Sequence, residues 1–314
     1  MPDFITINGQ KIGLGAVKKV NLNIAKLPTH TNIDLLVHVY RAKEDGPVLL
    51  LTGGLHGDEI NGIEIIRRLI ASKKILPKKG TVIAIPIVNV YGFILNERGV
   101  PDGKDINRSF PGVKGGSLAR LLAYTLLNDI IPEIDCGIDF HTGGASRANF
   151  PQIRCSLNLN DAKELAQAFA PPVILHSILI SHSFRSAAHK KGKPILVYET
   201  GESSRFDEFG ISEGINGTLR LMKHLNMIDE APAESGIKTF RKSIWVRARN
   251  AGLFLPILKL GETVTKNQII ATINDPYGAK NTKMISPVNG RIIGQNNKPL
   301  VHKGDALIHI AYNS

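Results

Sequence analysis

The sequence predicts an α/β protein with a mixed, mostly parallel central sheet flanked by helices, followed by a small C-terminal all-β domain. Two observations predict this class. Apolar runs of strand length alternate with segments of helical periodicity over the first two thirds of the chain. Residues 228–236 then form a polar linker with Pro and Gly, beyond which the apolar runs lack helical periodicity. We expect an α/β domain over residues 1–230 and a β domain over residues 236–314.

The first predicted core strand, PVLLLT at residues 47–52, is nearly continuous in apolar residues, as in strands buried on both faces. A loop bounded by glycines, GGLHGDE, follows it. Residues 60–74 then form a predicted helix with a basic outer face. Its isoleucines recur at helical spacing: Ile60, Ile63, Ile66 and Ile70.

Further core strands are predicted at residues 81–89, 136–142 and 194–200, and intervening helices at residues 117–131 and 161–170. Short strands separated by Gly, Pro and Asn turns are predicted beyond the linker. They lie within residues 237–248, 252–258, 268–273, 283–294 and 306–312.

The composition, 43% hydrophobic and 21% charged residues, excludes a disordered or fibrous chain. No apolar run approaches the roughly 20 residues that span a bilayer, and residues 1–10 lack the pattern of an export signal. Cys136 and Cys155 suit neither a disulfide framework nor a four-thiolate zinc site. We therefore expect a cytoplasmic protein with no membrane partner.

The formal net charge of +12 fits either a surface that binds polyanions or a field that attracts small acidic substrates. The basic residues occur as scattered pairs, and aromatic residues make up only 6% of the chain. This distribution favours small acidic substrates, and we expect no nucleic-acid partner. A basic nucleic-acid-binding protein with a non-catalytic site is the alternative from a different class.

Two histidines and a carboxylate follow predicted core strands. His56 and Glu59 form His-x-x-Glu in the loop after the first strand, and His141 lies at the end of another strand. Loops beyond the carboxyl ends of strands meet in one crevice of an open α/β sheet. Two imidazoles and one carboxylate are a common catalytic zinc shell, because three protein ligands leave the fourth position for water. This pattern predicts a metal site.

Glu199 ends a third core strand, where its carboxylate would face the same crevice. A carboxylate beside activated water can take the water proton and pass it to a leaving amine. The polar segment of residues 96–112 adds Arg98, Asn107 and Arg108. One guanidinium can stabilise an oxyanion and another can hold a substrate carboxylate, although Asp105 in the same segment can instead pair with an arginine.

Four ordered motifs resemble the succinylglutamate desuccinylase/aspartoacylase family, zinc deacylases related to the zinc carboxypeptidases. They are GGLHGDE at 53–59, DINRSFPG at 105–112, DFHT at 139–142 and YETG at 198–201. The resemblance covers most of the chain and implies a zinc carboxypeptidase-like fold with one Zn²⁺ per chain. It also implies a role for each matched residue: zinc ligands His56, Glu59 and His141, general base Glu199, oxyanion stabiliser Arg98, and substrate-carboxylate anchors Asn107 and Arg108.

The resemblance extends to two further substrate-binding residues. Arg185 lies 14 positions before Glu199, roughly where relatives carry a second substrate-binding arginine. Tyr277 lies in the predicted β domain, from which some relatives supply a tyrosine to the active site; the alternative is a turn residue that packs on that domain.

The predicted activity is that of a zinc-dependent amidohydrolase acting on linear amide C–N bonds. It would remove the acyl group from a small N-acyl amino acid or a related carboxylate-bearing amide. A zinc metallocarboxypeptidase acting on short peptides is the alternative, because it would use the same ligands, base and carboxylate clamp. The acyl group, the amine and the oligomeric state stay open.

Overall fold

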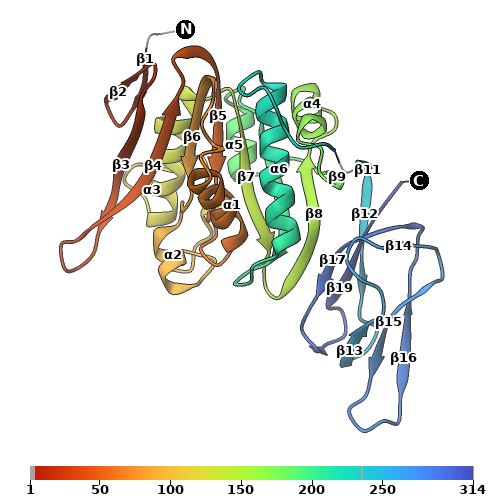
Figure 1. Ribbon diagram of the computed structural model, residues 1–314. Helices are drawn as coiled ribbons and strands as arrows, with labels where there is room; N and C mark the ends of the chain where they lie inside the picture. Colours follow the sequence, from red (N-terminus) through yellow and green to blue (C-terminus); the bar gives the residue numbers. More distant parts are fainter. Residues whose placement is uncertain (1–3, 235, 314) are drawn as a thin grey trace.

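A mixed 13-stranded sheet forms the centre of the protein, whose computed structural model describes residues 4–234 and 236–313 (Figure 1). Its main path runs β12-β19-β17-β8-β10-β7-β5-β6-β4-β3. The strands of this sheet are β3 (Val17–Lys26), β4 (Asn32–Arg41), β5 (Glu44–Thr52), β6 (Lys79–Ile85), β7 (Cys136–Gly143), β8 (Arg147–Cys155), β9 (Val173–His176), β10 (Ile195–Glu202), β11 (Lys238–Phe240), β12 (Lys242–Arg247), β14 (Thr263–Val264), β17 (Gly290–Asn296) and β19 (Ala306–Tyr312).

The four predicted core strands pair in parallel as β6-β5-β7-β10, which confirms the α/β class. Strand β6 ends at Ile85, four residues earlier than predicted, because the chain turns there into a helix. The Asn89 side chain accepts a hydrogen bond from the Gly92 amide and caps that helix. The helices are α1 (Ile60–Ala71), α2 (Val90–Leu95), α3 (Leu118–Thr125), α4 (Asn160–Phe169), α5 (Phe184–His189) and α6 (Glu208–His224).

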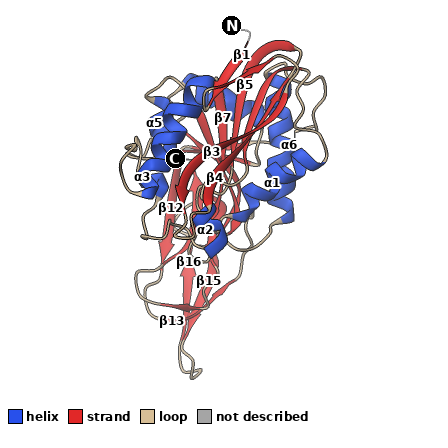
Figure 2. Cartoon of the chain, turned by 90° about the vertical axis from the view of Figure 1, so that its left-hand side faces the viewer, coloured by secondary structure: helices blue, strands red, loops and turns tan. Residues whose placement is uncertain are grey.

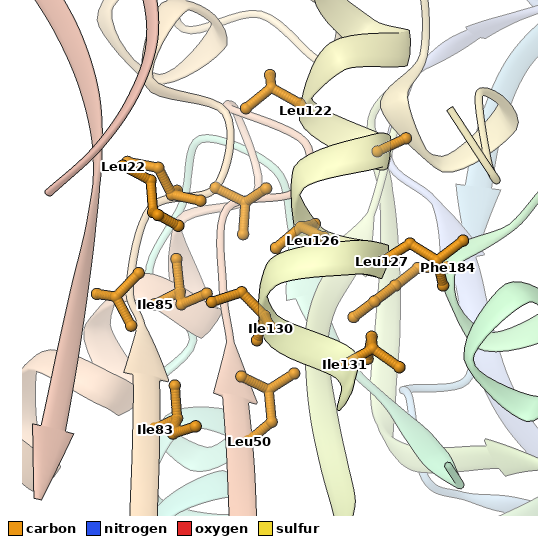
Figure 3. Packing of buried hydrophobic residues seen from close by; sticks show 14 of the residues in the cluster. Leu22, Leu50, Ile83, Ile85, Leu122, Leu126, Leu127, Ile130, Ile131 and Phe184 are labelled. Atoms are coloured by element: carbon orange, nitrogen blue, oxygen red, sulfur yellow. The ribbon is translucent and has the colours of Figure 1, made fainter. Parts of the chain in front are cut away.

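Helices cover both faces of the parallel strands (Figure 2). Helices α1, α4 and α6 pack together on one face, while α3 and α5 lie on the other. The predicted helix at 117–131 is regular only as far as Thr125; a π-helical turn (Leu126–Ile130) and a 3₁₀ turn (Ile131–Glu133) follow it. Leu122, Leu126 and Ile130 from this segment pack on Leu50 and Ile83 of β5 and β6 (Figure 3).

Antiparallel strands widen the sheet on both sides of the parallel centre. Strands β4 and β3 extend it beyond β6, and β8 extends it beyond β10. Strand β17 then pairs with β8, so the C-terminal strands continue the central sheet. The remaining strands form a four-stranded antiparallel sheet and an N-terminal hairpin: β13 (Gly252–Pro256), β15 (Ile269–Asn274), β16 (Asn281–Ile285), β18 (Leu300–Val301), and β1 (Phe4–Ile7) with β2 (Gln10–Gly13).

Both cysteines are buried thiols. Burial raises the pKa of Cys136 to about 12 and that of Cys155 to about 11, so both stay protonated at neutral pH. Within residues 4–234 and 236–313, no helix is both long enough and apolar enough to span a bilayer.

Gly62 allows α1 to pack closely on β7, the strand that carries His141. A Cβ at Gly62 would lie 2.5 Å from the Phe140 Cβ and 3.0 Å from the Phe140 carbonyl oxygen. We expect Gly62→Ala to destabilise the protein by about 1–3 kcal/mol, since overpacking outweighs the gain in helix propensity. Thermal unfolding should show a Tm lower by several degrees.

Gly115→Ala is the matched control, because an added Cβ at Gly115 meets no atom within 4 Å. Its Tm should equal that of the wild type. Equal Tm values for the two variants would contradict the close packing at Gly62.

Candidate active site

The candidate catalytic residues meet where three parallel strands end. His56 and Glu59 lie between β5 and α1, His141 lies near the end of β7, and Glu199 lies near the end of β10. His141 and Glu199 are direct neighbours in the β7–β10 register. All four line a single pocket of about 270 Å³, as expected for the carboxyl edge of an open α/β sheet.

The GGLHGDE loop is held close to the backbone of neighbouring segments. Gly57 lies so close to α2 that a Cβ there would come within 1.9 Å of the Gly92 carbonyl carbon. A Cβ at Gly53 would come within 2.9 Å of Gly62 in α1. Side chains are therefore excluded at these two positions, which explains why glycines bracket His56.

His56, Glu59 and His141 form a buried group with the geometry of a metal site, the metal group. One ligand atom from each residue lies within 4.8 Å of the others. The Nδ1 atoms of His56 and His141 each lie 2.8 Å from a different carboxylate oxygen of Glu59. The three residues are at most 4% exposed. Two imidazole nitrogens and a carboxylate oxygen are ligands that suit zinc.

Two aspartates hold the far sides of the imidazole rings. Asp105 Oδ1 lies 3.1 Å from His56 Nε2, and Asp139 Oδ2 lies 2.7 Å from His141 Nε2. A proton on each Nε2 satisfies these contacts and leaves both Nδ1 lone pairs free for a cation. Carboxylates beyond ligating histidines fix the ring orientation in metal sites in this way.

The charges of this cluster fit a divalent cation. With neutral imidazoles, Glu59, Asp105 and Asp139 contribute −3 and Arg98 contributes +1, which leaves −2 in a largely buried volume. Burial alone would lower the pKa of His141, but Asp139 and Glu59 raise it well above its usual range. Burial alone would raise the pKa of Glu59, but the two histidines hold it well below its usual range. The cluster therefore attracts positive charge.

Arg98 touches the metal group directly. Its Nη1 donates to Glu59 Oε1 at 2.9 Å, and its Nη2 donates to Asp105 Oδ2 at 3.0 Å. The pairing of Asp105 with an arginine is thus confirmed. The Arg98 side chain is 43% exposed and lines the pocket, so its guanidinium borders both the metal group and the substrate space.

Asn107, Arg108 and Arg185 gather on another wall of the pocket. Asn107 Oδ1 accepts a hydrogen bond from the Phe184 amide at 2.9 Å, which joins the 105–108 segment to the start of α5. The buried Arg185 guanidinium donates to backbone carbonyls, including that of Ile178. Neither Arg108 nor Arg185 forms an ion pair with any described residue.

Two residues of β8 hold Glu199, and no local sequence pattern points to them. Asn149 Nδ2 donates to Glu199 Oε2 at 2.7 Å, and Arg154 Nη1 lies 3.3 Å from Glu199 Oε1. Neither residue stands in a catalytic motif. Strand β8 follows β7 as an antiparallel partner of β10, so only strand pairing brings these side chains to Glu199.

The C-terminal strands supply Trp245, and not Tyr277, to the pocket wall. Trp245 on β12 lines the pocket, whereas Tyr277, between β15 and β16, is 92% exposed and does not line it. The Trp245 and His309 rings stack at 4.5 Å with an interplanar angle of 8°. Arg147, the first residue of β8, lies over the Trp245 ring at 5.7 Å.

Known proteins share this chain's sequence and fold. A protein from Halomonas elongata named N-alpha-acetyl-L-2,4-diaminobutyric acid deacetylase is 29% identical over 245 residues, covering 74% of this chain and 71% of its own. A succinylglutamate desuccinylase/aspartoacylase structure from Rhodobacter sphaeroides has a TM-score of 0.82 at 26% identity, covering 95% of this chain and 96% of that one.

The product-bound structure of the ectoine utilization protein EutE (DoeB) from Ruegeria pomeroyi has a TM-score of 0.84 at 20% identity and covers both chains fully, which supports the same fold. The family model of the succinylglutamate desuccinylase/aspartoacylase catalytic domain matches residues 45–225, more than half of the chain. This match includes the metal group, Glu199 and the arginines of the 96–112 segment. The chain belongs to the succinylglutamate desuccinylase/aspartoacylase family.

Proposed function

We propose that this protein is a zinc-dependent deacylase that hydrolyses the amide bond of a small N-acyl amino acid. The buried His56–Glu59–His141 group, with Glu199 at the wall of the same pocket, carries the proposal. The relative from Halomonas elongata is named as a deacetylase of an N-acetyl amino acid, which supports this reaction. Glu59 and the Nδ1 atoms of His56 and His141 would hold one zinc ion.

Bound zinc would act as a Lewis acid that activates water and polarises the acyl carbonyl. Glu199 would take the proton of the attacking water and return it to the departing amine. Asn149 would orient Glu199, because the Asn149 side-chain amide donates a hydrogen bond to one oxygen of the Glu199 carboxylate. Arg98 would donate to the oxyanion that develops on the carbonyl, since Glu59 and Asp105 already hold its guanidinium in place.

Arg108, with Asn107 and Arg185 beside it, would anchor the substrate carboxylate. A guanidinium matches a carboxylate with two parallel hydrogen bonds, and Arg108 has no described carboxylate partner of its own. The pocket of about 270 Å³, closed on one side by Trp245, suits a small substrate better than the extended peptide of a carboxypeptidase. Five arginines line this pocket, which favours a small anion over a nucleic acid: Arg98, Arg108, Arg147, Arg154 and Arg185.

Replacing a ligand and its supporting aspartate should weaken metal binding to different degrees. His141→Ala removes a ligand atom and should abolish stoichiometric zinc and turnover. Asp139→Asn keeps the ligand but loses the carboxylate held by His141 Nε2, so zinc affinity should fall about 10- to 100-fold. Metal titration of the two purified variants measures both effects. Stoichiometric zinc in His141→Ala would contradict the assigned ligands.

The Glu199→Gln variant should still bind zinc but should have a lower kcat. The amide preserves the size of the side chain but cannot accept the water proton, so kcat should fall about 10²- to 10⁴-fold. Steady-state kinetics on an N-acyl amino acid, with metal content measured on the same samples, tests this. A variant with near-normal kcat and full zinc would show that another group is the base.

Arg108→Ala should raise KM for an N-acyl amino acid with little change in kcat, because it removes a contact made equally in the ground and transition states. Arg108→Lys should not restore KM, since an ammonium cannot reproduce the planar fork. The control is an N-acyl amino acid amide, which lacks the free carboxylate. If the wild type hydrolysed the acid and the amide equally well, Arg108 would not be the anchor of the substrate carboxylate.

A further inference from the structure

The side-chain amide of Asn149 lies between the two strands that flank β8 at this position. Its Nδ2 donates to Glu199 Oε2 at 2.7 Å, on the β10 side. An ionised carboxylate only accepts hydrogen bonds, so the nitrogen of the amide has to face Glu199. The Oδ1 end lies on the β17 side, 3.2 Å from the position that a Cβ on Gly294 would take. Strand β17 therefore limits where the amide can lie.

Asn149 belongs to a row of residues that are direct partners across four neighbouring strands. Trp245 of β12 is paired with His309 of β19, and His309 is paired with Gly294 of β17. Gly294 is in turn paired with Asn149 of β8. The row joins the C-terminal strands to the side chain that holds Glu199.

Gly294 is the most crowded position of this row. Its φ lies outside the left-handed region, so the backbone conformation does not require a glycine. A Cβ at Gly294 would lie 3.1 Å from the His309 Cβ and 3.2 Å from Asn149 Oδ1, both closer than ordinary van der Waals contact. The same Cβ would lie 3.5 Å from Trp245 Cη2, which is an ordinary contact. A methyl group here would therefore press on His309 and on the Asn149 amide, but not on the Trp245 ring.

His309 is held more firmly than the Asn149 amide. Its ring stacks on Trp245 at 4.5 Å, and the residue is only 6% exposed. Burial, and then the charge of Arg154, lower the pKa of His309 to about 3, so this stack is uncharged at neutral pH and does not compete with Arg154 for Glu199. Asn149, in contrast, lines the pocket and can move into it. Pressure from a side chain at position 294 would thus displace the amide.

We propose that Gly294 is a positioning residue for the general base, because its lack of a side chain lets the Asn149 amide hold Glu199. This inference rests on the proposed deacylase function. It goes further, since the C-terminal strands then act on the proton-transfer step and not only on the width of the pocket. A displaced amide would leave Glu199 Oε2 without its donor, and the carboxylate would lose the orientation in which it accepts the water proton.

The test is a double-mutant cycle on the zinc-loaded full chain, with an N-acyl amino acid that the wild type hydrolyses. Asn149→Ala should lower kcat about 10- to 100-fold, the loss expected for a hydrogen bond to a charged group. Gly294→Ala should lower kcat about tenfold with little change in KM, because a misplaced catalytic group slows the reaction without weakening substrate binding. In the Asn149→Ala background, Gly294→Ala should lower kcat no further, since the side chain through which it acts is gone.

Ile292→Val is the matched control for a loss of stability in the same strand. Ile292 lies two positions before Gly294 on β17 and is buried in the apolar core of the C-terminal strands. Removing one methyl group from this core should lower Tm by a few degrees and leave kcat at the wild-type value. Tm and zinc content, measured on every variant, verify that each one folds and holds its metal.

A second measurement does not depend on activity. In crystal structures of the zinc-loaded proteins, Asn149 Nδ2 should lie within hydrogen-bond distance of Glu199 Oε2 in the wild type and in Ile292→Val. In Gly294→Ala it should lie beyond that distance, with the metal group unchanged.

The outcomes separate the positioning role from the deacylase proposal. An unmoved Asn149 amide in Gly294→Ala, losses of kcat that multiply in the double variant, or a rise in KM at unchanged kcat would each overturn the positioning role while leaving deacylation intact. No turnover of any N-acyl amino acid by the zinc-loaded wild type would overturn the deacylase function itself, and the crystal structures would still decide whether Gly294 places the amide.

Discussion

Negative charge buried at the carboxyl edge of the sheet is the constraint on which the rest of the site depends. Glu59, Asp105 and Asp139 surround two imidazole rings, and Arg98 is the single guanidinium bonded to the cluster among the described residues. Buried carboxylates are costly unless cations or donors surround them. A divalent ion would satisfy this need. Under the proposed function, the same ion would activate the attacking water.

Close backbone packing positions this cluster. Glycines in the loop after β5 let it lie against α2 and α1, and Gly62 lets α1 lie against β7. His141 then faces Glu59 from the neighbouring strand, with contacts that leave little freedom to either ring. Rigid supports of this kind are what a metal site requires, because ligand geometry must be held by residues beyond the ligands.

The C-terminal strands have a role in the pocket as well as in the fold. They extend the central sheet through the β8–β17 pairing and bring Trp245 to the pocket wall. Arg147 of β8 lies over the Trp245 ring, so the α/β part and the C-terminal strands meet at the pocket wall. Both parts of the chain therefore line the pocket that contains His56, Glu59 and His141.

The sequence by itself determined the parallel centre of the fold and the meeting of His56, Glu59, His141 and Glu199 at one edge of the sheet. Strands buried on both faces are continuous apolar runs, and polar residues at the carboxyl ends of parallel strands lie at the same edge. Strands β3, β4 and β8, the irregular turns after Thr125, and the partners Asn149 and Arg154 came only from the tertiary structure. The same holds for Trp245 at the pocket wall and the exposed position of Tyr277. Local patterns record burial and turn chemistry, whereas contacts between distant segments depend on strand pairing, which no local pattern encodes.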